Sequence, residues 1–115
     1  MAEPNTQIIK FLKILCDETR LNILEHLKDG KKSSKQLEKL LRKKQSTISH
    51  HLTTLIEFSL VESEIKEIDK KNIHFYGIKN NDIFNLLSQI RNFIENANSK
   101  KFQERKKKEL YDILT

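Results

Sequence analysis

The sequence predicts a mainly α-helical domain that carries one β-hairpin after its first half. Apolar residues recur every three or four positions in residues 5–58 and again in residues 80–97, which is the spacing of amphipathic helices. Between these regions, residues 60–67 and 73–78 are rich in β-branched and aromatic residues, which favour strands. A length of 115 residues suits a single domain with one core.

The first two helices are separated by a short polar connection. Residues 5–15 form one apolar stripe at helical spacing. Asp17 is expected to be the N-cap of the second helix, because its carboxylate can accept a hydrogen bond from a free backbone N–H of the first turn. Gly30 is a natural stop after that helix.

A short helix, a tight turn and a longer helix follow. Ser33 and Gln36 have the spacing of a capping box, which marks the start of the short helix. The chain is expected to break at residues 42–44, and the next helix runs from Gln45 to about Phe58. Together these elements predict a helix-turn-helix at about residues 34–58.

The remaining elements are a hairpin and a last helix. The hairpin spans about residues 60–78, with residues 68–72 as its polar tip. A long helix is expected at about residues 80–99, with a kink or fraying at residues 96–99, followed by a basic extension over residues 100–115. A hairpin directly after a helix-turn-helix is a wing, so the fold class is a winged helix-turn-helix. In such a pair the second helix places its N-terminal residues in the major groove of DNA.

The charge distribution favours a polyanionic partner. Lys and Arg outnumber Asp and Glu by 22 to 16, for a net charge of +6. Residues 31–44 hold seven basic residues and one acidic residue, and residues 100–108 hold six and one. Basic blocks of this kind attract nucleic acid, although a solvated charged face that keeps the protein soluble is the alternative.

Several function classes are excluded or disfavoured by composition. A single cysteine, Cys16, rules out an internal disulfide framework and any multi-cysteine zinc site, and we expect it to be a small core residue rather than a redox switch. Two glycines leave no Gly-rich phosphate loop, and no nucleophile or metal motif is found, so we expect no enzyme and no cofactor. Without a signal peptide or an apolar run of 18 residues, a cytoplasmic, chromosome-associated protein is expected, with no membrane partner.

Three motifs carry a resemblance to a known family. Gln45 to Leu52, QSTISHHL, closely resembles the recognition helix of the ArsR family of winged helix-turn-helix repressors. Residues 15–24, LCDETRLNIL, look like the family's LSDPTRLRIL, and residues 75–78, FYGI, look like the YYRL that closes its wing. The resemblance covers about residues 8–95 and implies an intracellular, homodimeric transcriptional repressor whose first and last helices form the dimer interface. Apolar residues expected in that interface are Ile8, Phe11, Leu12, Leu15, Ile83, Leu86, Leu87, Ile90, Phe93 and Ile94.

The chain departs from the family pattern in the turn and in the wing. Arg42 occupies the usual glycine position of the turn, and a positive φ is unfavourable for arginine, so a different turn with Ser46 as the helix cap is expected. Glu62 and Glu64 occupy a wing strand that is often basic in the family, which should weaken backbone contacts there.

Double-stranded DNA is the expected partner, and the expected contacts fall into two classes. Gln and the hydroxyl residues can bond to base edges, whereas Lys neutralises phosphates without reading sequence. The expected base-reading residues are Gln45, Ser46, Thr47, Ser49 and His50. The expected phosphate contacts are Lys35, Lys43, Lys44, Lys70 and Lys71, with Lys31 and Lys32 as further candidates. His51 lies nearer the core edge and is expected to be a partly buried, hydrogen-bonded residue.

No metal is expected. The family's cysteine site would fall at residues 32–35, which read Lys-Ser-Ser-Lys, and the last helix contains Asp82 and Glu95 but no histidine. His26 and His74 stand alone in the sequence and are expected to be structural.

The sequence therefore predicts a sequence-specific, homodimeric DNA-binding regulator, most simply a repressor. The alternative is a winged-helix module that binds another protein and binds DNA weakly or not at all, which Glu62 and Glu64 favour. A third possibility, general coating of nucleic acid, would rest on the two lysine blocks alone.

Overall fold

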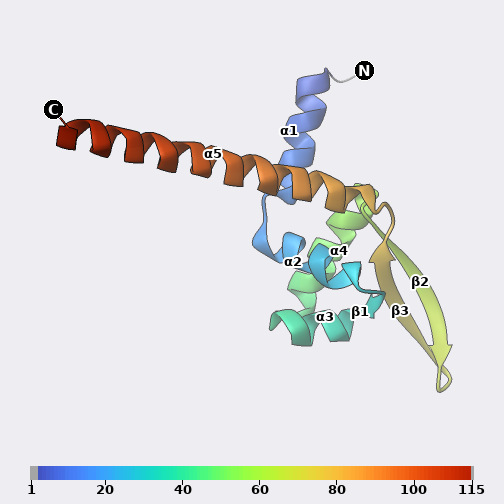
Figure 1. Ribbon diagram of the computed structural model, residues 1–115. Helices are drawn as coiled ribbons and strands as arrows, with labels where there is room; N and C mark the ends of the chain where they lie inside the picture. Colours follow the sequence, from blue (N-terminus) through green and yellow to red (C-terminus); the bar gives the residue numbers. More distant parts are fainter. Residues whose placement is uncertain (1–2, 115) are drawn as a thin grey trace. The chain divides into compact units, whose positions relative to one another are not determined.

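The structure, a computed structural model, describes residues 3–114 apart from the side chain of Phe102. The chain divides into two compact units, one up to Asn80 and one from Asn81 onward. The first unit contains helices α1 to α4 and the hairpin, and the second is the single helix α5 (Figure 1).

The first two helices begin and end for local reasons. α1 spans Pro4–Leu15, with a proline in its first turn, where no N–H partner is needed. α2 spans Glu18–Lys28, and the Asp17 carboxylate accepts a hydrogen bond from the Arg20 N–H at 3.0 Å. This confirms the predicted cap.

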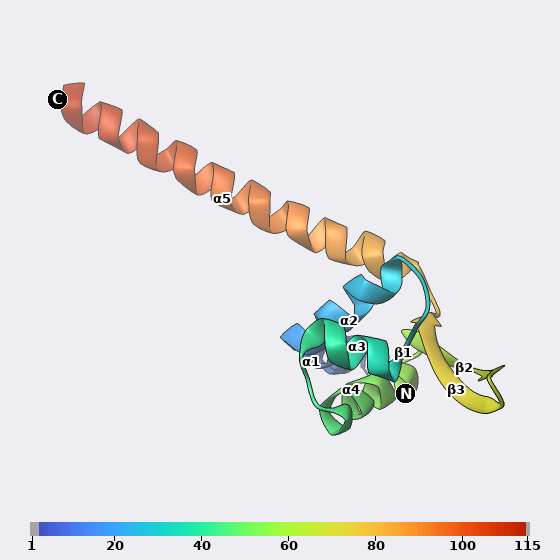
Figure 2. The same ribbon diagram turned by 90° about the horizontal axis from the view of Figure 1, so that it is seen from below.

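The helix-turn-helix has the predicted elements. α3 spans Ser34–Leu41 and begins with the predicted capping box, in which the Gln36 N–H donates to the Ser33 hydroxyl and the Ser33 N–H donates to the Gln36 side chain. α4 spans Gln45–Glu57. The two helices lie side by side, joined by the short turn (Figure 2).

The sheet has three antiparallel strands in the order β1-β3-β2. β2 (Val61–Ile68) and β3 (Lys71–Ile78) form the wing. The prediction of a five-residue tip was wrong: Ile68 pairs with Lys71, so only Asp69 and Lys70 form the turn, both at positive φ, as a type I′ hairpin turn requires. β1 (Lys32–Ser33) was not predicted, because two residues are too few to show a strand pattern.

The core of the first unit is entirely apolar. Its buried side chains come from the end of α1, from α2, α3 and α4, and from the start of the wing: Leu15, Ile23, Leu24, Leu27, Leu37, Ile48, Leu52, Leu55, Leu60 and Val61. Burial of such side chains contributes roughly 1.5–3 kcal/mol each, so this core is the main stabilising element of the unit.

The second unit is a continuous helix. α5 spans Asp82–Leu114, 33 residues, so the expected interruption at residues 96–99 does not occur and the helix includes most of the basic extension. Asp82 lies in its first turn, where a negative charge suits the helix dipole. Among the described residues, no helix combines the length and the apolar content that crossing a membrane requires.

Candidate nucleic-acid interface

The turn between α3 and α4 forms without a glycine. Arg42 has φ 54° and ψ 45°, the left-handed conformation, which costs a non-glycine residue roughly 1–2 kcal/mol. The Arg42 and Lys43 N–H groups both donate to the Glu38 carbonyl oxygen, which closes the end of α3. The expectation of a different turn, capped by Ser46, was therefore wrong: α4 already begins at Gln45, and the residue at its N-cap is Lys44, whose side chain makes no capping bond.

Helix α4 has one buried face and one polar face. Ile48, Leu52 and Leu55 are buried in the core. On the other side, four of the predicted base-reading residues are exposed, namely Gln45, Ser46, Ser49 and His50, while Thr47 is half-buried. The hydroxyls of Thr53 and Thr54 are occupied further along the helix, since they donate to the Ser49 and His50 carbonyl oxygens. Their donor protons are therefore used within the helix, whereas Gln45, Ser46, Ser49 and His50 lie exposed in its first turns.

A groove of about 540 Å³ runs between the helix-turn-helix and the wing. Gln45 and Ser49 line it from α4, and Lys71 lines it from the wing. The residues that complete it come from the start of α3 and from β3: Ser33, Ser34, Lys35, Glu38, Asn72, Ile73, His74 and Tyr76. The groove thus brings together three predicted contact residues, Gln45, Ser49 and Lys71, with Lys35 as a fourth.

Apart from Lys71, sequence reasoning missed the β3 side of this groove. His74 was expected to be an isolated structural residue, but it is exposed and lines the groove. Asn72, His74 and Tyr76 alternate along β3 and so share one face of the sheet. The alternation was visible in the sequence, but nothing local indicated that this face would lie opposite α4.

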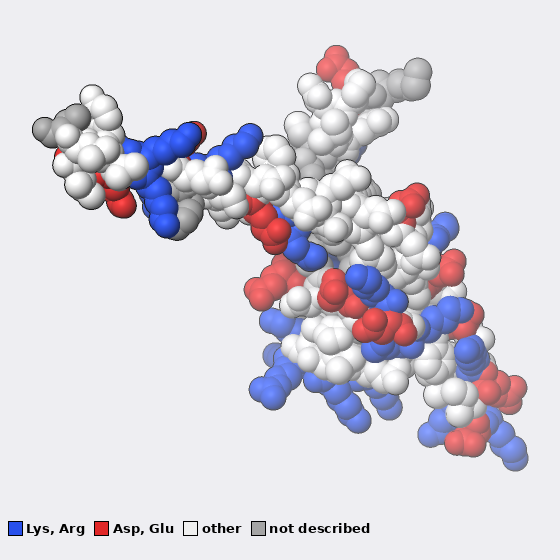
Figure 3. Space-filling view, in the orientation of Figure 1, with Lys and Arg blue, Asp and Glu red and all other residues white. Residues whose placement is uncertain are grey.

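The five lysines predicted to contact phosphates all have exposed side chains. Lys35, Lys43 and Lys44 are exposed, as are Lys70 in the hairpin turn and Lys71 at the start of β3. Figure 3 shows basic side chains gathered on the edge of the first unit below α3, whereas the wing tip carries both signs.

Lys31 and Lys32, the further candidates for phosphate contacts, have partners within the chain. The Lys31 ammonium lies 2.8 Å from a Glu64 carboxylate oxygen, and the Lys32 ammonium donates to the His26 carbonyl oxygen at 2.8 Å. Their charge is therefore used inside the first unit.

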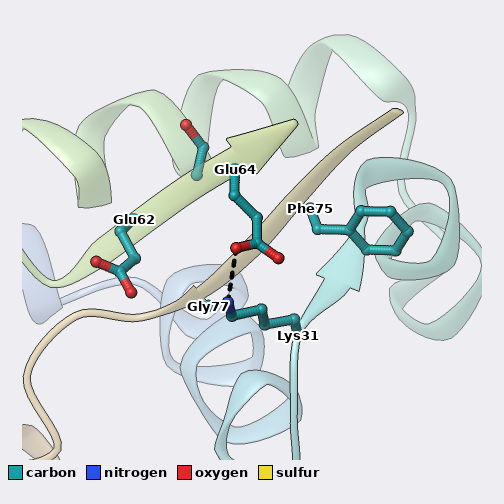
Figure 4. Close-up of a pocket in the computed structure, with 6 residues that line it drawn as sticks. Lys31, Glu62, Glu64, Phe75 and Gly77 are labelled. Atoms are coloured by element: carbon teal, nitrogen blue, oxygen red, sulfur yellow. Dashed lines mark hydrogen bonds and ion pairs between the residues drawn. The ribbon is translucent and has the colours of Figure 1, made fainter. Parts of the chain in front are cut away.

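Glu62 and Glu64 lie on the sheet face opposite His74 and Tyr76, which line the groove, and on the same face as Lys71. Glu62 pairs with Gly77 and Glu64 with Phe75, so these acids share a face with Phe75 and not with His74 or Tyr76. They line a separate small pocket together with Lys31 (Figure 4). Glu64 is flanked by Lys31 and by Lys66, whose ammonium lies 3.3 Å from the second carboxylate oxygen. The hydrogen bond from Lys31 and the nearby Lys66 ammonium lower the pKa of Glu64, and the bond to Glu64 raises the pKa of Lys31.

His51 is a half-buried, hydrogen-bonded residue, as predicted. Its Nδ1 accepts a hydrogen bond from Arg20 Nε at 3.0 Å, and its Nε2 lies 4.0 Å from the Asp17 carboxylate. Burial lowers the pKa of His51 and outweighs the opposing effect of Asp17. The imidazole is therefore neutral at pH 7 and belongs to the support of α4 rather than to its exposed face.

Neither a thiol site nor a metal site is found in the described part of the chain. Cys16 is exposed, which corrects the expectation of a core residue: it is the C-cap of α1, one position beyond the buried Leu15. Across residues 3–114, no three His, Cys, Asp or Glu side chains come together in a way that could hold a metal ion.

The residues predicted for a dimer interface separate into buried and exposed sets. Leu15 and Ile83 are already buried within the single chain. On α1, Ile8 and Leu12 are exposed, joined by Ile9, which was not predicted; Phe11 is half-buried. On α5, Leu87 is half-buried, and the exposed members are Leu86, Ile90, Phe93 and Ile94.

Comparisons with known proteins match this geometry. Residues 17–63, which include α2, the helix-turn-helix and the start of the wing, match the family described as "Bacterial regulatory protein, arsR family". The chain is 30% identical over 106 residues to YdfF of Bacillus subtilis, an uncharacterized HTH-type transcriptional regulator. That alignment covers 90% of this chain and 45% of YdfF, so the chain spans less than half the length of this relative.

Two solved structures share the fold. The crystal structure of Rv0081 from M. tuberculosis is 25% identical, with a TM-score of 0.73 over 87% of this chain and 98% of that chain. The solution structure of Mb0332 from Mycobacterium bovis has a TM-score of 0.62 at 20% identity, over 83% of this chain and 88% of that one. Mb0332 is described as a homodimeric winged helix-turn-helix DNA-binding domain and a possible ArsR-family transcriptional regulator. Over residues 17–63, which include the helix-turn-helix, the chain is thus similar to the arsR family of bacterial regulatory proteins.

Proposed function

We propose that this chain is a DNA-binding transcriptional regulator that acts as a sequence-specific homodimeric repressor. The observation that carries the proposal is the exposed polar start of α4, where Gln45 and Ser49 open onto the groove between α3 and the wing. Gln bonds adenine through its N6 and N7 atoms, and Ser adapts to bases or phosphates. The family match over residues 17–63, the similarity to YdfF and the shared fold of Mb0332 support this class of function.

The groove suits the phosphate strand that separates a major from a minor groove. With α4 in the major groove, the adjacent phosphates would run between α4 and the wing. Lys35 and Lys71 supply positive charge on two sides of the groove, while Tyr76 and His74 supply hydrogen-bonding groups from the sheet. Glu38 is the one acidic group in the lining. Lys35 and Lys71 can therefore neutralise a phosphate, and His74 and Tyr76 can form hydrogen bonds to it.

The orientation of Glu62 and Glu64 argues against the alternative of a protein-binding module. These acids were the feature that favoured that alternative, and they share the face opposite His74 and Tyr76. Glu64 is further compensated by Lys31 and Lys66. These two acids therefore lie away from His74 and Tyr76, whereas Glu67, which pairs with Asn72, is the acid of β2 on the His74 side of the sheet.

A homodimer is proposed from the exposed apolar residues of α1 and α5 and from the homodimeric state of Mb0332. A two-fold dimer would place two copies of α4 about one turn of DNA apart, so the operator should be a pseudo-palindrome. A protein that represses chromosomal genes acts in the cytoplasm, where we place it.

The test is recovery of bound genomic fragments by the full chain, beginning with its own promoter. Specific binding gives a ratio of cognate to random affinity of about 10³ or more. A ratio near one would indicate coating of nucleic acid, and weak binding to both DNAs would indicate a protein-binding module. Either result would contradict the proposal.

A further inference from the structure

Arg20 joins two parts of the first unit through opposite edges of one guanidinium group. Its Nε donates to His51 Nδ1 on α4 at 3.0 Å, and its Nη1 donates to the Ile14 carbonyl oxygen, in the last turn of α1, at 3.2 Å. Its own backbone N–H donates to the Asp17 carboxylate at 3.0 Å. One half-buried side chain on α2 therefore contacts the last turn of the helix before it and the helix that carries Gln45 and Ser49.

The chemistry of this link is directional. The guanidinium is planar and carries its donors in a rigid fork, so it can satisfy two acceptors only when they lie in fixed directions. The His51 Nδ1 atom accepts only when the imidazole is neutral and its proton is on Nε2. The contact therefore constrains both the tautomer of His51 and the position of α4 relative to the end of α1.

We propose that Arg20 is a positioning residue. Acting through His51, it fixes the position of the recognition helix α4 relative to the end of α1. The proposal rests on the proposed DNA-binding function, since the position of α4 decides which bases its side chains can reach. It adds a coupling that the proposed function does not contain: a displacement of α1, which offers the exposed Ile8 and Leu12, would be passed to α4 through one side chain.

Protonation of His51 is the natural perturbation of this link. The charged groups that face His51 are Asp17 before α2, Arg20 on α2, His50 on α4 and Lys43 in the turn before α4. Protonated His51 would present an N–H to the Arg20 N–H and place two positive charges in contact, with only Asp17 in opposition. Because burial lowers the pKa of His51 from the ordinary value of 6.5, the link should break as the pH falls through that lowered pKa.

The first test compares variants at neutral pH, well below their melting temperatures. His51→Ala and Arg20→Ala should each weaken cognate binding about tenfold, and the double variant should be no weaker than either single one, because residues in contact act as a unit. His51→Gln keeps an acceptor oxygen and should stay within about threefold of the parent. Lys10→Ala is the control for lost charge, since Lys10 is exposed on α1.

The second test is the pH profile of cognate affinity. Between about pH 7.5 and about pH 5.5 the parent should lose affinity relative to His51→Gln, because only the parent has an imidazole at this position. The other three histidines are present in both proteins, so their protonation cancels from the ratio. Parallel profiles for the parent and His51→Gln, or unchanged affinity in Arg20→Ala and His51→Ala, would overturn the inference.

A measurement without DNA separates failure of this inference from failure of the proposed function. Imidazole ¹⁵N spectra of the free protein should show His51 with its proton on Nε2, and amide hydrogen exchange in α4 should accelerate in Arg20→Ala but not in Lys10→Ala. If no cognate DNA is found, the proposed function fails while these data still decide whether Arg20 holds α4. Unchanged exchange in Arg20→Ala would overturn the inference by itself.

Discussion

Lys31 and Glu64 form an ion pair between the loop before β1 and the first wing strand, with 2.8 Å between the ammonium nitrogen and a carboxylate oxygen. The Lys31 side chain lies over Gly77. A Cβ atom added at Gly77 would lie 3.0 Å from the Lys31 Cγ, so the glycine leaves room for this contact. A basic residue from the lysine-rich segment and an acidic residue of the wing thus neutralise each other. This explains how Glu64, one of three glutamates on this wing strand, is compatible with the basic surface proposed to bind DNA nearby.

The pair predicts a pH-dependent anchoring of the wing. The folded-state pKa of Glu64 is lowered from 4.5, so the pair stabilises the fold above that value and is lost as the pH falls through the lowered pKa. Glu64→Gln should lower the melting temperature slightly at neutral pH, and the difference from the parent should vanish in acid. Glu62→Gln, the same change on the same strand face, is the control. A difference that persists unchanged in acid would show that the pair is not its source.

Gln45→Ala tests base reading. Because a bidentate contact to a base is worth about 1–3 kcal/mol, the variant should lose that much affinity for the cognate site and far less for random DNA. Thr53→Ala is a matched control on the same helix, since the Thr53 hydroxyl is occupied by the Ser49 carbonyl oxygen at 2.9 Å. Equal weakening on cognate and random DNA, measured by fluorescence anisotropy, would show that the start of α4 is not the reading surface.

Lys43→Ala tests phosphate neutralisation. Lys43 is exposed in the turn before α4, so its loss should weaken cognate and random DNA alike and reduce the salt slope of binding by about one. Lys31→Ala also removes one positive charge, but Lys31 is already paired with Glu64, so the salt slope of this variant should change less. Affinities at three or more salt concentrations give the slopes. Indistinguishable slopes for the two variants would contradict the assignment.

Dimerisation through the exposed apolar residues of α1 can be tested by sedimentation. At micromolar concentration the chain should sediment at twice its mass of 13.6 kDa. Leu12→Glu should shift it toward the monomer, because Leu12 is 49% exposed in the single chain and a charge there would be buried by a partner. Lys10→Glu, on the same helix, should have little effect. A parent protein that is strictly monomeric would refute this prediction.

Metal should leave DNA binding unchanged. Zinc needs several nitrogen or sulfur ligands that converge, and the described residues do not provide them. Adding zinc or a chelator should alter the cognate affinity by less than about twofold, against the tenfold change that about 1.4 kcal/mol of coupling would produce. A stoichiometric zinc site that shifts affinity tenfold would reveal ligands that this arrangement of side chains does not suggest.

The sequence by itself determined the features that depend on neighbours along the chain. The Asp17 cap, the capping box at Ser33 and Gln36, and the helical apolar spacing all involve residues three or four positions apart. They are therefore visible in any short window. The same locality explains why the residues of QSTISHHL are enough to place this segment on a helix with one polar face.

Only the tertiary structure decided what those elements face. The register of β2 against β3 turned Glu64 toward Lys31, 33 positions away, and turned His74 toward the groove. The partner of His51 lies 31 positions earlier, at Arg20. Arg42 takes a left-handed conformation against its local preference, because the hydrogen bonds at the end of α3 and the burial of α3 and α4 outweigh a cost of roughly 1–2 kcal/mol. Contacts of this kind arise from packing between distant segments, which local spacing does not encode.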